Sequence, residues 1–283
     1  MGAPRRTTTK TKPTPGGKAC GFSSFVVYLG YGNSVNRERL YMTSSLQQTL
    51  EELFAANRIL AGEGVIDGFG HVSVRNPLQP DHYFMTRSNA GGPVEESGVI
   101  ELDAESDVIR PVDVRPSIER FIHGEIYRAR PDVMAVVHTH APALIPFGVS
   151  PTPLRPLYHM CGFLAAGVPV FDIRKDHGMT NLLITRADLG RALAATLGNC
   201  AVVLMRGHGA TVVGTSLKEA VFRAVYTMVN SQLQPIAMQL GEPTYLAPEE
   251  ARLADELHHA VLNRPWEYWL EKHPIHSRER QTS

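Results

Sequence analysis

The first strong pattern of apolar positions in the chain is helical. From Ser45 onward, apolar residues recur three or four positions apart, which places them on one face of a helix. Ser44 or Ser45 is suited to cap the start of this helix, and Gly62 and Gly64 would end it. The apolar face comprises Leu46, Leu50, Leu53, Phe54 and Leu60.

Shorter alternating or β-branched runs predict strands, and further helical patterns lie between them. A helix is expected to begin at Pro116, because proline favours the first helical turn, and to end before Pro131. No internal repeat is present, so the pattern predicts one α/β domain over residues 43–265. The expected strands are His71–Arg75, Tyr83–Thr86, Val99–Leu102, 133–138 and 201–205, and the later helices are 181–197, 217–239 and 248–262.

Charge separates the N-terminal segment from the rest of the chain. Residues 1–42 hold seven Lys or Arg residues and one acid, Glu38, which leaves 21 of the 28 basic and 27 of the 28 acidic residues for the remainder. The segment is rich in Pro, Thr, Gly and Lys and is predicted to be a basic, disordered extension. Residues 266–283 are expected to form a C-terminal tail. An acidic body argues against nucleic-acid binding.

The cysteines and the apolar runs bear on location. The three cysteines are scattered without the spacing of a disulfide framework or a thiolate metal site, which fits a reducing cytoplasm. No apolar run is long enough to span a bilayer. The chain is therefore expected to be cytoplasmic and not bound to a membrane.

The strongest chemical signal is His138-Thr139-His140 at the end of the predicted strand 133–138. Residues two apart on a strand project from the same face, so both imidazoles point to one place. A single histidine there would more often be a core residue, but a pair at this spacing favours a metal site.

Two weaker signals point the same way. Gly207-His208-Gly209 follows the apolar strand 201–205, and flanking glycines permit a tight exit, although an ordinary turn explains that segment equally well. Glu119 lies in the expected first turn of the helix that begins at Pro116, where an acid is usually a dipole partner. It gains meaning if it faces the histidines.

In combination these segments resemble the class II aldolase/adducin family over roughly residues 45–245. The family has a Pro-Ser-x-(Glu/Asp) helix start, a His-x-His strand and a later Gly-His-Gly, here Pro116–Glu119, His138–His140 and Gly207–Gly209. The resemblance implies a three-layer α/β/α sandwich around a mostly antiparallel sheet. It also implies a homotetramer with active sites between subunits. His138, His140 and His208 would bind one divalent metal, with Glu119 as fourth ligand or acid–base group.

The chain departs from the sugar-phosphate enzymes of that family where they bind phosphate. His71 stands in place of an expected Asn, and Ile118 in place of a second Ser after Ser117. An isoleucine cannot donate a hydrogen bond to phosphate, so burying phosphate against it would be costly. The loop from Thr86 to Gly92 supplies Arg87 and Ser88 instead. Arg75 and Arg87 are each suited to pair with a carboxylate.

The resemblance also assigns a role to His159. It lies in the segment from which family aldolases present a catalytic tyrosine to the neighbouring subunit, and imidazole would supply an acid–base group near neutrality.

With these departures the chain resembles the decarboxylase branch of the family, whose members act on hydroxylated aromatic or pyridine dicarboxylates. The expected substrate is a di-acid like 3-hydroxy-2-methylpyridine-4,5-dicarboxylate, bound by His71, Arg75, Arg87, Ser88 and Ser117. A manganese or zinc ion would act as Lewis acid. Either His159 or Glu119 would then protonate the ring carbon after carbon dioxide leaves. Two alternatives stay open: a retro-aldol lyase on an unphosphorylated hydroxy-carbonyl compound, and a non-catalytic adducin-like interaction module.

Overall fold

The computed structural model describes residues 34–86, 98–112 and 114–275. The chain divides into two units, Met1–Arg39 and Leu40–Ser283, and the discussion below concerns the second. Residues 1–33 lie outside the described part, so their predicted disorder stays a prediction, as does the domain boundary at residue 43. Residues 34–42, which were also predicted to be disordered, are helical.

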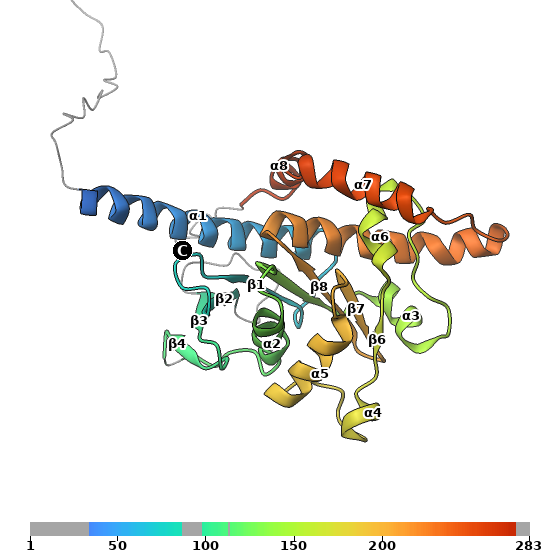
Figure 1. The fold of residues 1–283 in the computed structure, drawn as a ribbon, viewed down its shortest axis with the longest axis horizontal. Coiled ribbons are helices and arrows are strands. Elements are labelled where there is room, and N and C mark those ends of the chain that lie inside the picture. Colours follow the sequence, from blue (N-terminus) through green and yellow to red (C-terminus); the bar gives the residue numbers. More distant parts are fainter. Residues whose placement is uncertain (1–33, 87–97, 113, 276–283) are drawn as a thin grey trace, which may run out of the picture. The chain divides into compact units, whose positions relative to one another are not determined.

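An eight-stranded sheet forms the centre of the second unit (Figure 1). The strand order is β4-β3-β2-β1-β5-β8-β7-β6, and neighbours are antiparallel except for the parallel pair β6–β7. The strands are β1 His71–Arg75, β2 Tyr83–Thr86, β3 Val99–Leu102, β4 Val108–Arg110, β5 Ala135–Thr139, β6 Val170–Phe171, β7 Val202–Met205 and β8 Gly209–Gly214.

Helices cover both faces of this sheet, as Figure 1 shows. The α-helices are α1 Ser34–Gly62, α2 Phe121–Ala129, α3 Ile145–Val149, α4 Arg174–His177, α5 Ala187–Leu197, α6 Leu217–Leu240, α7 Pro248–Ala260 and α8 Asn263–Lys272. The structure also has the 3-10 segments η2 Pro142–Leu144 and η3 His159–Ala166.

Alternation along the strands divides the interior into two cores. On β5, Val137 packs with residues of α1 and α6, whereas Val136 packs with residues of α2 and α5. Each core buries the apolar stripe of its helices against one face of the sheet, which provides the main driving force for folding. The predicted three-layer sandwich with a mostly antiparallel sheet is confirmed.

Several element boundaries differ from the prediction. Helix α1 begins at Ser34, so neither Ser44 nor Ser45 caps it. Helix α2 begins at Phe121, so Pro116 is not in its first turn. Helix α5 begins at Ala187, which leaves residues 181–186 outside any helix.

Several elements were not anticipated from the pattern, among them the short helices α3 and α4, three strands and helix α8. Strands β4 and β6 are too short to show an alternation, and β8 begins with glycine and alanine, which are weak strand formers. Helix α8 runs past the expected domain end at residue 265. Its Trp266 and Trp269 are buried in the core that also contains residues of α1 and α6, so the packed body extends to Lys272.

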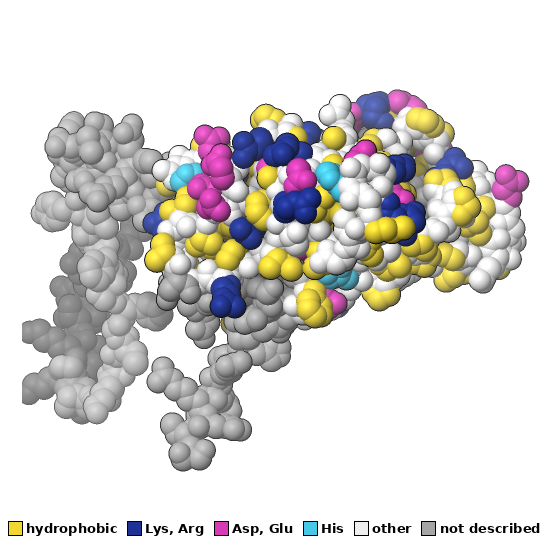
Figure 2. All heavy atoms as spheres, turned by 90° about the horizontal axis from the view of Figure 1, so that it is seen from below, with side chains coloured by type: hydrophobic (Ala, Val, Ile, Leu, Met, Phe, Trp, Pro, Cys, Tyr) yellow, Lys and Arg dark blue, Asp and Glu magenta, His cyan; other side chains and the backbone are white. Residues whose placement is uncertain are grey.

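On the face seen in Figure 2, Lys and Arg side chains lie interspersed with Asp and Glu side chains and apolar ones. Among the described residues, no helix combines the length and the apolar character that crossing a bilayer requires.

Candidate metal centre

The sheet brings two histidines to the end of β5. His138 is fully buried on the strand, on the face covered by α2 and α5, and His140 follows directly after it. Their Nε2 atoms are 3.0 Å apart. The prediction that these two rings point to one place is confirmed.

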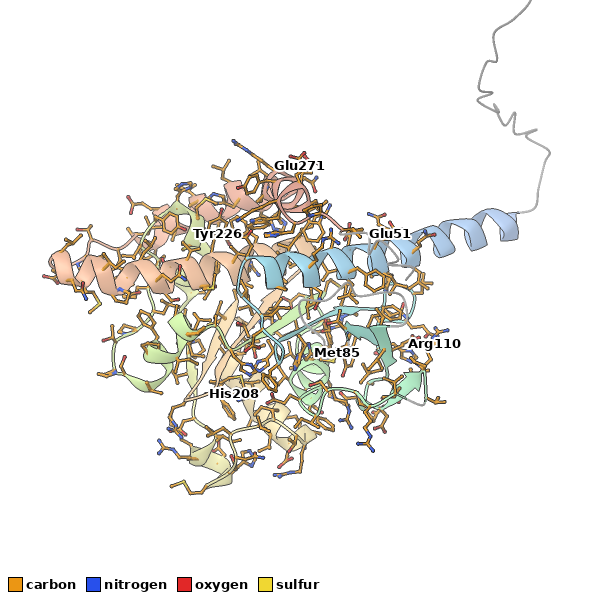
Figure 3. The ribbon with its side chains drawn as sticks, turned by 180° about the vertical axis from the view of Figure 1, so that it is seen from behind. Glu51, Met85, Arg110, His208, Tyr226 and Glu271 are labelled. Atoms are coloured by element: carbon orange, nitrogen blue, oxygen red, sulfur yellow. The ribbon has the colours of Figure 1, made fainter. Side chains whose placement is uncertain are left out.

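A tight hairpin between β7 and β8 supplies the third histidine. Gly207 adopts a φ of 66°, which a residue with a β-carbon rarely takes. A β-carbon on Gly209 would overlap the carbonyl oxygen of Thr139. Because β8 pairs with β5, this close approach places His208 (labelled in Figure 3) beside His140, and the two Nε2 atoms are 3.0 Å apart. The backbone therefore requires glycine at both positions of the Gly-His-Gly segment.

Glu119 reaches the histidines from a turn before α2. Its backbone N–H donates to Ser117 Oγ at 3.2 Å, which shapes this turn. Its buried carboxylate accepts a hydrogen bond from the Ile184 backbone N–H at 2.9 Å through Oε1. The second oxygen, Oε2, lies 3.5 Å from His208 Nε2 and 3.7 Å from His138 Nε2.

The four side chains form a set that suits one divalent cation. One ligand atom from each residue lies within 4.8 Å of all the others. Two nitrogens bound to one zinc ion at about 2.0–2.1 Å would be about 3 Å apart, which agrees with the spacing found here. Three imidazoles and one carboxylate suit zinc, manganese or iron.

Hydrogen bonds at the other ring nitrogens orient these histidines. His138 Nδ1 lies 3.2 Å from the carbonyl oxygen of Ala210, and His208 Nδ1 lies 2.9 Å from that of Leu182. A carbonyl can only accept, so each Nδ1 carries the hydrogen and each Nε2 keeps its lone pair for a metal. His140 Nδ1 lies 3.7 Å from Asp67 Oδ1, a weaker contact of the same kind.

The protonation states also suit cation binding. Burial alone would raise the pKa of Glu119, but the neighbouring imidazoles of His208 and His138 and the N–H of Ile184 outweigh burial and lower the pKa to about 2. Burial lowers the pKa of His138 well below the usual range and also lowers that of His140. At neutral pH the site therefore presents neutral imidazoles at His138 and His140 and a carboxylate at Glu119, and protons compete little with a cation for these groups.

Buried histidines should make the metal-free protein sensitive to mild acid. Burial lowers the pKa values of His71, His123 and His138 well below 6.5, so the folded state does not take up their protons while the unfolded state does. Stability is then complete above pH 6.5 and falls below it, by about 1.4 kcal/mol per histidine for each pH unit. Thermal unfolding between pH 7.5 and 5 measures this, and His123→Gln should flatten the slope. An unfolding midpoint that does not change with pH would contradict the expectation.

The structure assigns Arg75 a different role from the one expected. Its buried guanidinium donates to the backbone carbonyls of Val133, Pro80, Tyr127 and Arg130 at 3.0, 2.6, 2.8 and 3.1 Å. These bonds tie β1 to the end of α2 and the start of β5. Arg75 is therefore a structural residue, in place of the substrate-binding role predicted from the sequence.

The other predicted substrate and catalytic residues fall into three groups. His71 is buried beside His138, with 5.1 Å between ring centroids, and half-buried Ser117 adjoins Glu119. Arg87 and Ser88 lie outside the described residues. His159 is exposed on η3, stacked on His258 of α7 with 5.1 Å between centroids. No described contact joins it to the metal ligands within one chain.

Several groups at the site gave no usable signal in the sequence. The carbonyl of Leu182 and the N–H of Ile184 hold His208 and Glu119, and both belong to the segment 181–186 that was expected to be helical. Leu182 adopts a φ of 70°, a left-handed conformation that leucine rarely takes. Asp67 and His123 were missed as site residues because isolated acids and histidines have no distinctive spacing.

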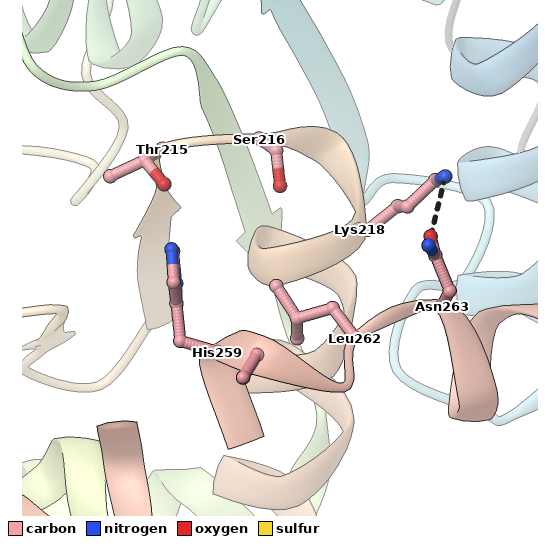
Figure 4. Close-up of a pocket in the computed structure, with 7 residues that line it drawn as sticks. Thr215, Ser216, Lys218, His259, Leu262 and Asn263 are labelled. Carbon is pink, nitrogen blue, oxygen red and sulfur yellow. Dashed lines mark hydrogen bonds between the residues drawn. The ribbon is translucent and has the colours of Figure 1, made fainter. Parts of the chain in front are cut away.

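A separate surface pocket lies between the start of α6 and the α7–α8 turn (Figure 4). Lys218 Nζ points away from its centre and donates to Asn263 Oδ1 at 2.9 Å. None of the four metal-site residues lines it, and its polar groups do not converge on one point. The pocket is lined by Thr215, Ser216, Lys218, His259, Ala260, Leu262 and Asn263.

Comparison with known proteins decides the family. A sequence profile described as "Class II Aldolase and Adducin N-terminal domain" matches residues 51–234. The chain belongs to the class II aldolase and adducin family. The resemblance inferred from the three motifs is therefore confirmed.

Relatives within the family include enzymes named as decarboxylases. The chain is 39% identical over 236 residues to "Decarboxylase tropJ" of Talaromyces stipitatus, covering 75% of this chain and 89% of that protein. It is 30% identical over 187 residues to a 3,4-dihydroxyphthalate decarboxylase of Terrabacter sp., covering 60% of this chain and 73% of that one.

Solved structures of the family share the fold. The L-fuculose 1-phosphate aldolase of Glaciozyma antarctica PI12 superposes with a TM-score of 0.66 at 21% identity, over 82% of this chain and 93% of that one. This likeness supports the three-layer architecture.

Proposed function

We propose that this protein is a metal-dependent decarboxylase of a hydroxylated aromatic acid. The observation that carries the proposal is the convergence of Glu119, His138, His140 and His208 within 4.8 Å of one another. Relatives of the chain that are named as decarboxylases favour carbon dioxide release over other reactions of such a centre. The enzyme is therefore a carboxy-lyase.

The substrate we propose is a di-acid whose ring carries a hydroxyl group next to a carboxylate. A relative named for 3,4-dihydroxyphthalate supports this class, and 3-hydroxy-2-methylpyridine-4,5-dicarboxylate has the same arrangement of groups. Ser117, Arg87 and Ser88 remain the proposed partners for its oxygens, together with His71. Arg75 is no longer among them, because backbone carbonyls occupy its guanidinium.

Different residues of the chain hold the cation and donate the proton. A divalent cation at the site would supply Lewis-acid stabilisation of the electron pair that remains when carbon dioxide departs. Glu119, with a pKa of about 2, is a carboxylate at neutral pH and is suited to hold the cation rather than to donate a proton. The proton for the ring carbon is therefore assigned to His159, presented by a neighbouring subunit.

The direct test is carbon dioxide release by the purified protein after metal analysis. Loaded with manganese or zinc, it should decarboxylate 3,4-dihydroxyphthalate or 3-hydroxy-2-methylpyridine-4,5-dicarboxylate, and a chelator should stop the reaction. Cleavage of an unphosphorylated hydroxy-carbonyl compound without carbon dioxide release would instead favour the retro-aldol alternative.

Sugar phosphates should not bind. Ile118 is 57% exposed where a phosphate-binding serine is expected, and His71 is buried with Nδ1 engaged by His123. An apolar side chain cannot replace the lost hydrogen bonds to phosphate. Calorimetric titration with fuculose or ribulose phosphates should show no binding at millimolar concentration, while the dicarboxylates bind in the same buffer. Tight binding of a sugar phosphate would instead favour a sugar-phosphate aldolase.

The adducin-like alternative predicts a protein that has the family fold but no catalytic activity. Such a module has no need to keep a metal-ligand set, yet all four ligand residues are present and converge. Full occupancy by metal with no turnover on any hydroxylated di-acid would favour that alternative.

Assembly and location complete the proposal. We propose a homotetramer in the cytoplasm, with active sites between subunits, because His159 lies away from the ligands of its own chain. The described cysteines, Cys161 and Cys200, are free thiols, as a reducing compartment requires.

A further inference from the structure

A row of four buried polar side chains lies between β1 and α2, next to the metal-ligand residues. His71 and Ser73 are two apart on the strand, and His123 and Tyr127 are four apart on the helix, so both pairs face the same layer. His71 Nδ1 is 2.7 Å from His123 Nε2, His123 Nδ1 is 2.6 Å from Ser73 Oγ, and Ser73 Oγ is 2.7 Å from the Tyr127 hydroxyl. All four side chains are at most 5% exposed.

One end of this row has no partner within the described chain. The Nε2 atom of His71 is buried and makes no hydrogen bond to any described residue. Buried polar groups are nearly always paired, so an unpaired one in an otherwise satisfied row calls for an explanation. The ring lies 5.1 Å from that of His138, across the β1–β5 register that pairs these two residues.

The other end of the row sets the direction of its hydrogen bonds. Among the described residues, the buried Tyr127 hydroxyl has one hydrogen-bond partner, Ser73 Oγ at 2.7 Å, so its own hydrogen goes to that oxygen, since it would otherwise be buried without an acceptor. Burial raises the pKa of Tyr127 far above its usual range, which keeps this hydrogen in place. Ser73 then donates to His123 Nδ1, and the remaining hydrogen of His123, on Nε2, is donated to His71 Nδ1.

This direction leaves His71 as a hydrogen-bond donor at Nε2. Its Nδ1 accepts from His123, so a neutral His71 ring carries its hydrogen on the unpartnered Nε2. A fixed donor in a water-excluded site stabilises negative charge on oxygen far better than the same donor in water. An aromatic hydroxy-acid offers two such oxygens, a carboxylate and a ring hydroxylate.

We propose that His71 Nε2–H donates a hydrogen bond to an anionic oxygen of the substrate at the metal centre, and that His123, Ser73 and Tyr127 are positioning residues that fix this direction. The substrate contact rests on the proposed function, whereas the direction of the row is a property of the protein alone. The two parts can therefore fail separately.

Nitrogen-15 NMR of histidine-labelled, zinc-loaded protein tests the direction of the row. The His71 signals, assigned by their loss in His71→Asn, should show hydrogen on Nε2 and none on Nδ1. In the Ser73→Ala/Tyr127→Phe double variant this preference should disappear. Tyr83→Phe is the matched control, because it removes a neighbouring buried hydroxyl that bonds Arg120 O outside the row. Hydrogen on Nδ1, or a double variant identical to wild type, would overturn the assignment.

A double-mutant cycle on turnover tests the contact itself. His71→Phe should lower kcat about 10²-fold, as loss of one oxyanion donor does, with metal content unchanged. In the His71→Phe background the Ser73→Ala/Tyr127→Phe change should cost nothing more, since the row acts only through His71. His71→Asn carries its own N–H donor and should recover part of the loss. Additive losses, or loss of metal from His71→Phe, would overturn the proposal.

Substrate analogues identify the oxygen. One analogue lacks the ring hydroxyl and another lacks the carboxylate. His71→Phe should weaken binding of the analogue that keeps the group contacted by His71, and it should leave binding of the other analogue unchanged. If His71→Phe no longer weakens binding once the analogue lacks the ring hydroxyl, His71 contacts the hydroxyl oxygen. If it no longer weakens binding once the analogue lacks the carboxylate, His71 contacts the carboxylate. Equal weakening of both analogues would show that His71 contacts neither.

Discussion

Replacing His140 by Ala should remove the bound metal and the decarboxylase activity together. Its Nε2 lies 3.0 Å from the corresponding atoms of both His138 and His208, so it stands at the centre of the ligand set. Without it only two imidazoles and one carboxylate remain. The loss of metal affinity should exceed the roughly 10–100-fold that removal of an outer-shell partner costs.

Metal content per chain and turnover on the same preparation measure this result. Asp67→Asn provides a graded comparison, since Asp67 contacts the His140 ring at 3.7 Å without belonging to the ligand set and should weaken metal binding less. His177→Ala, on α4 and apart from the site, is the neutral control. A fully active His140→Ala protein without metal would remove the basis of the proposed function.

The sequence predicted most of this centre because its ligands lie where local patterns are strong. The β-branched run before His138 and the glycines around His208 each identify a strand end on their own. Their meeting depends on β8, which the pattern did not reveal since it opens with glycine and alanine. The motif resemblance supplied the missing long-range link.

The errors arose where backbone groups outside regular structure determine what a side chain does. Arg75 was expected to face a substrate carboxylate, but four carbonyls at helix and strand ends bind its guanidinium. Residues 181–186 were expected to be helical, yet in a helix the Leu182 carbonyl would accept a backbone bond and would be lost to His208. Tertiary contacts of this kind leave no periodic trace in a sequence.

Replacing His159 by Ala should keep the metal and the assembly but lower turnover. After carbon dioxide departs, the ring carbon needs a proton from a positioned acid, and such general acid catalysis contributes about 10²–10⁴-fold. Glu119 is poorly suited to that task, because its pKa of about 2 leaves it ionised. His159 is exposed on η3, where a neighbouring subunit can approach it.

Four variants separate proton transfer from metal binding. His159→Ala should lose turnover within the range for a general acid at unchanged metal content and unchanged mass in solution, and His159→Tyr should recover part of it because a phenol can also donate a proton. His259→Ala, which removes an imidazole that is 60% exposed on α7, should turn over as wild type does. Glu119→Gln should lose metal, since its carboxylate lies 3.5 Å from His208 Nε2 and 3.7 Å from His138 Nε2. If His159→Ala retained full turnover while Glu119→Gln kept its metal and was inactive, the proton would come from Glu119 and the assignment of His159 would be wrong.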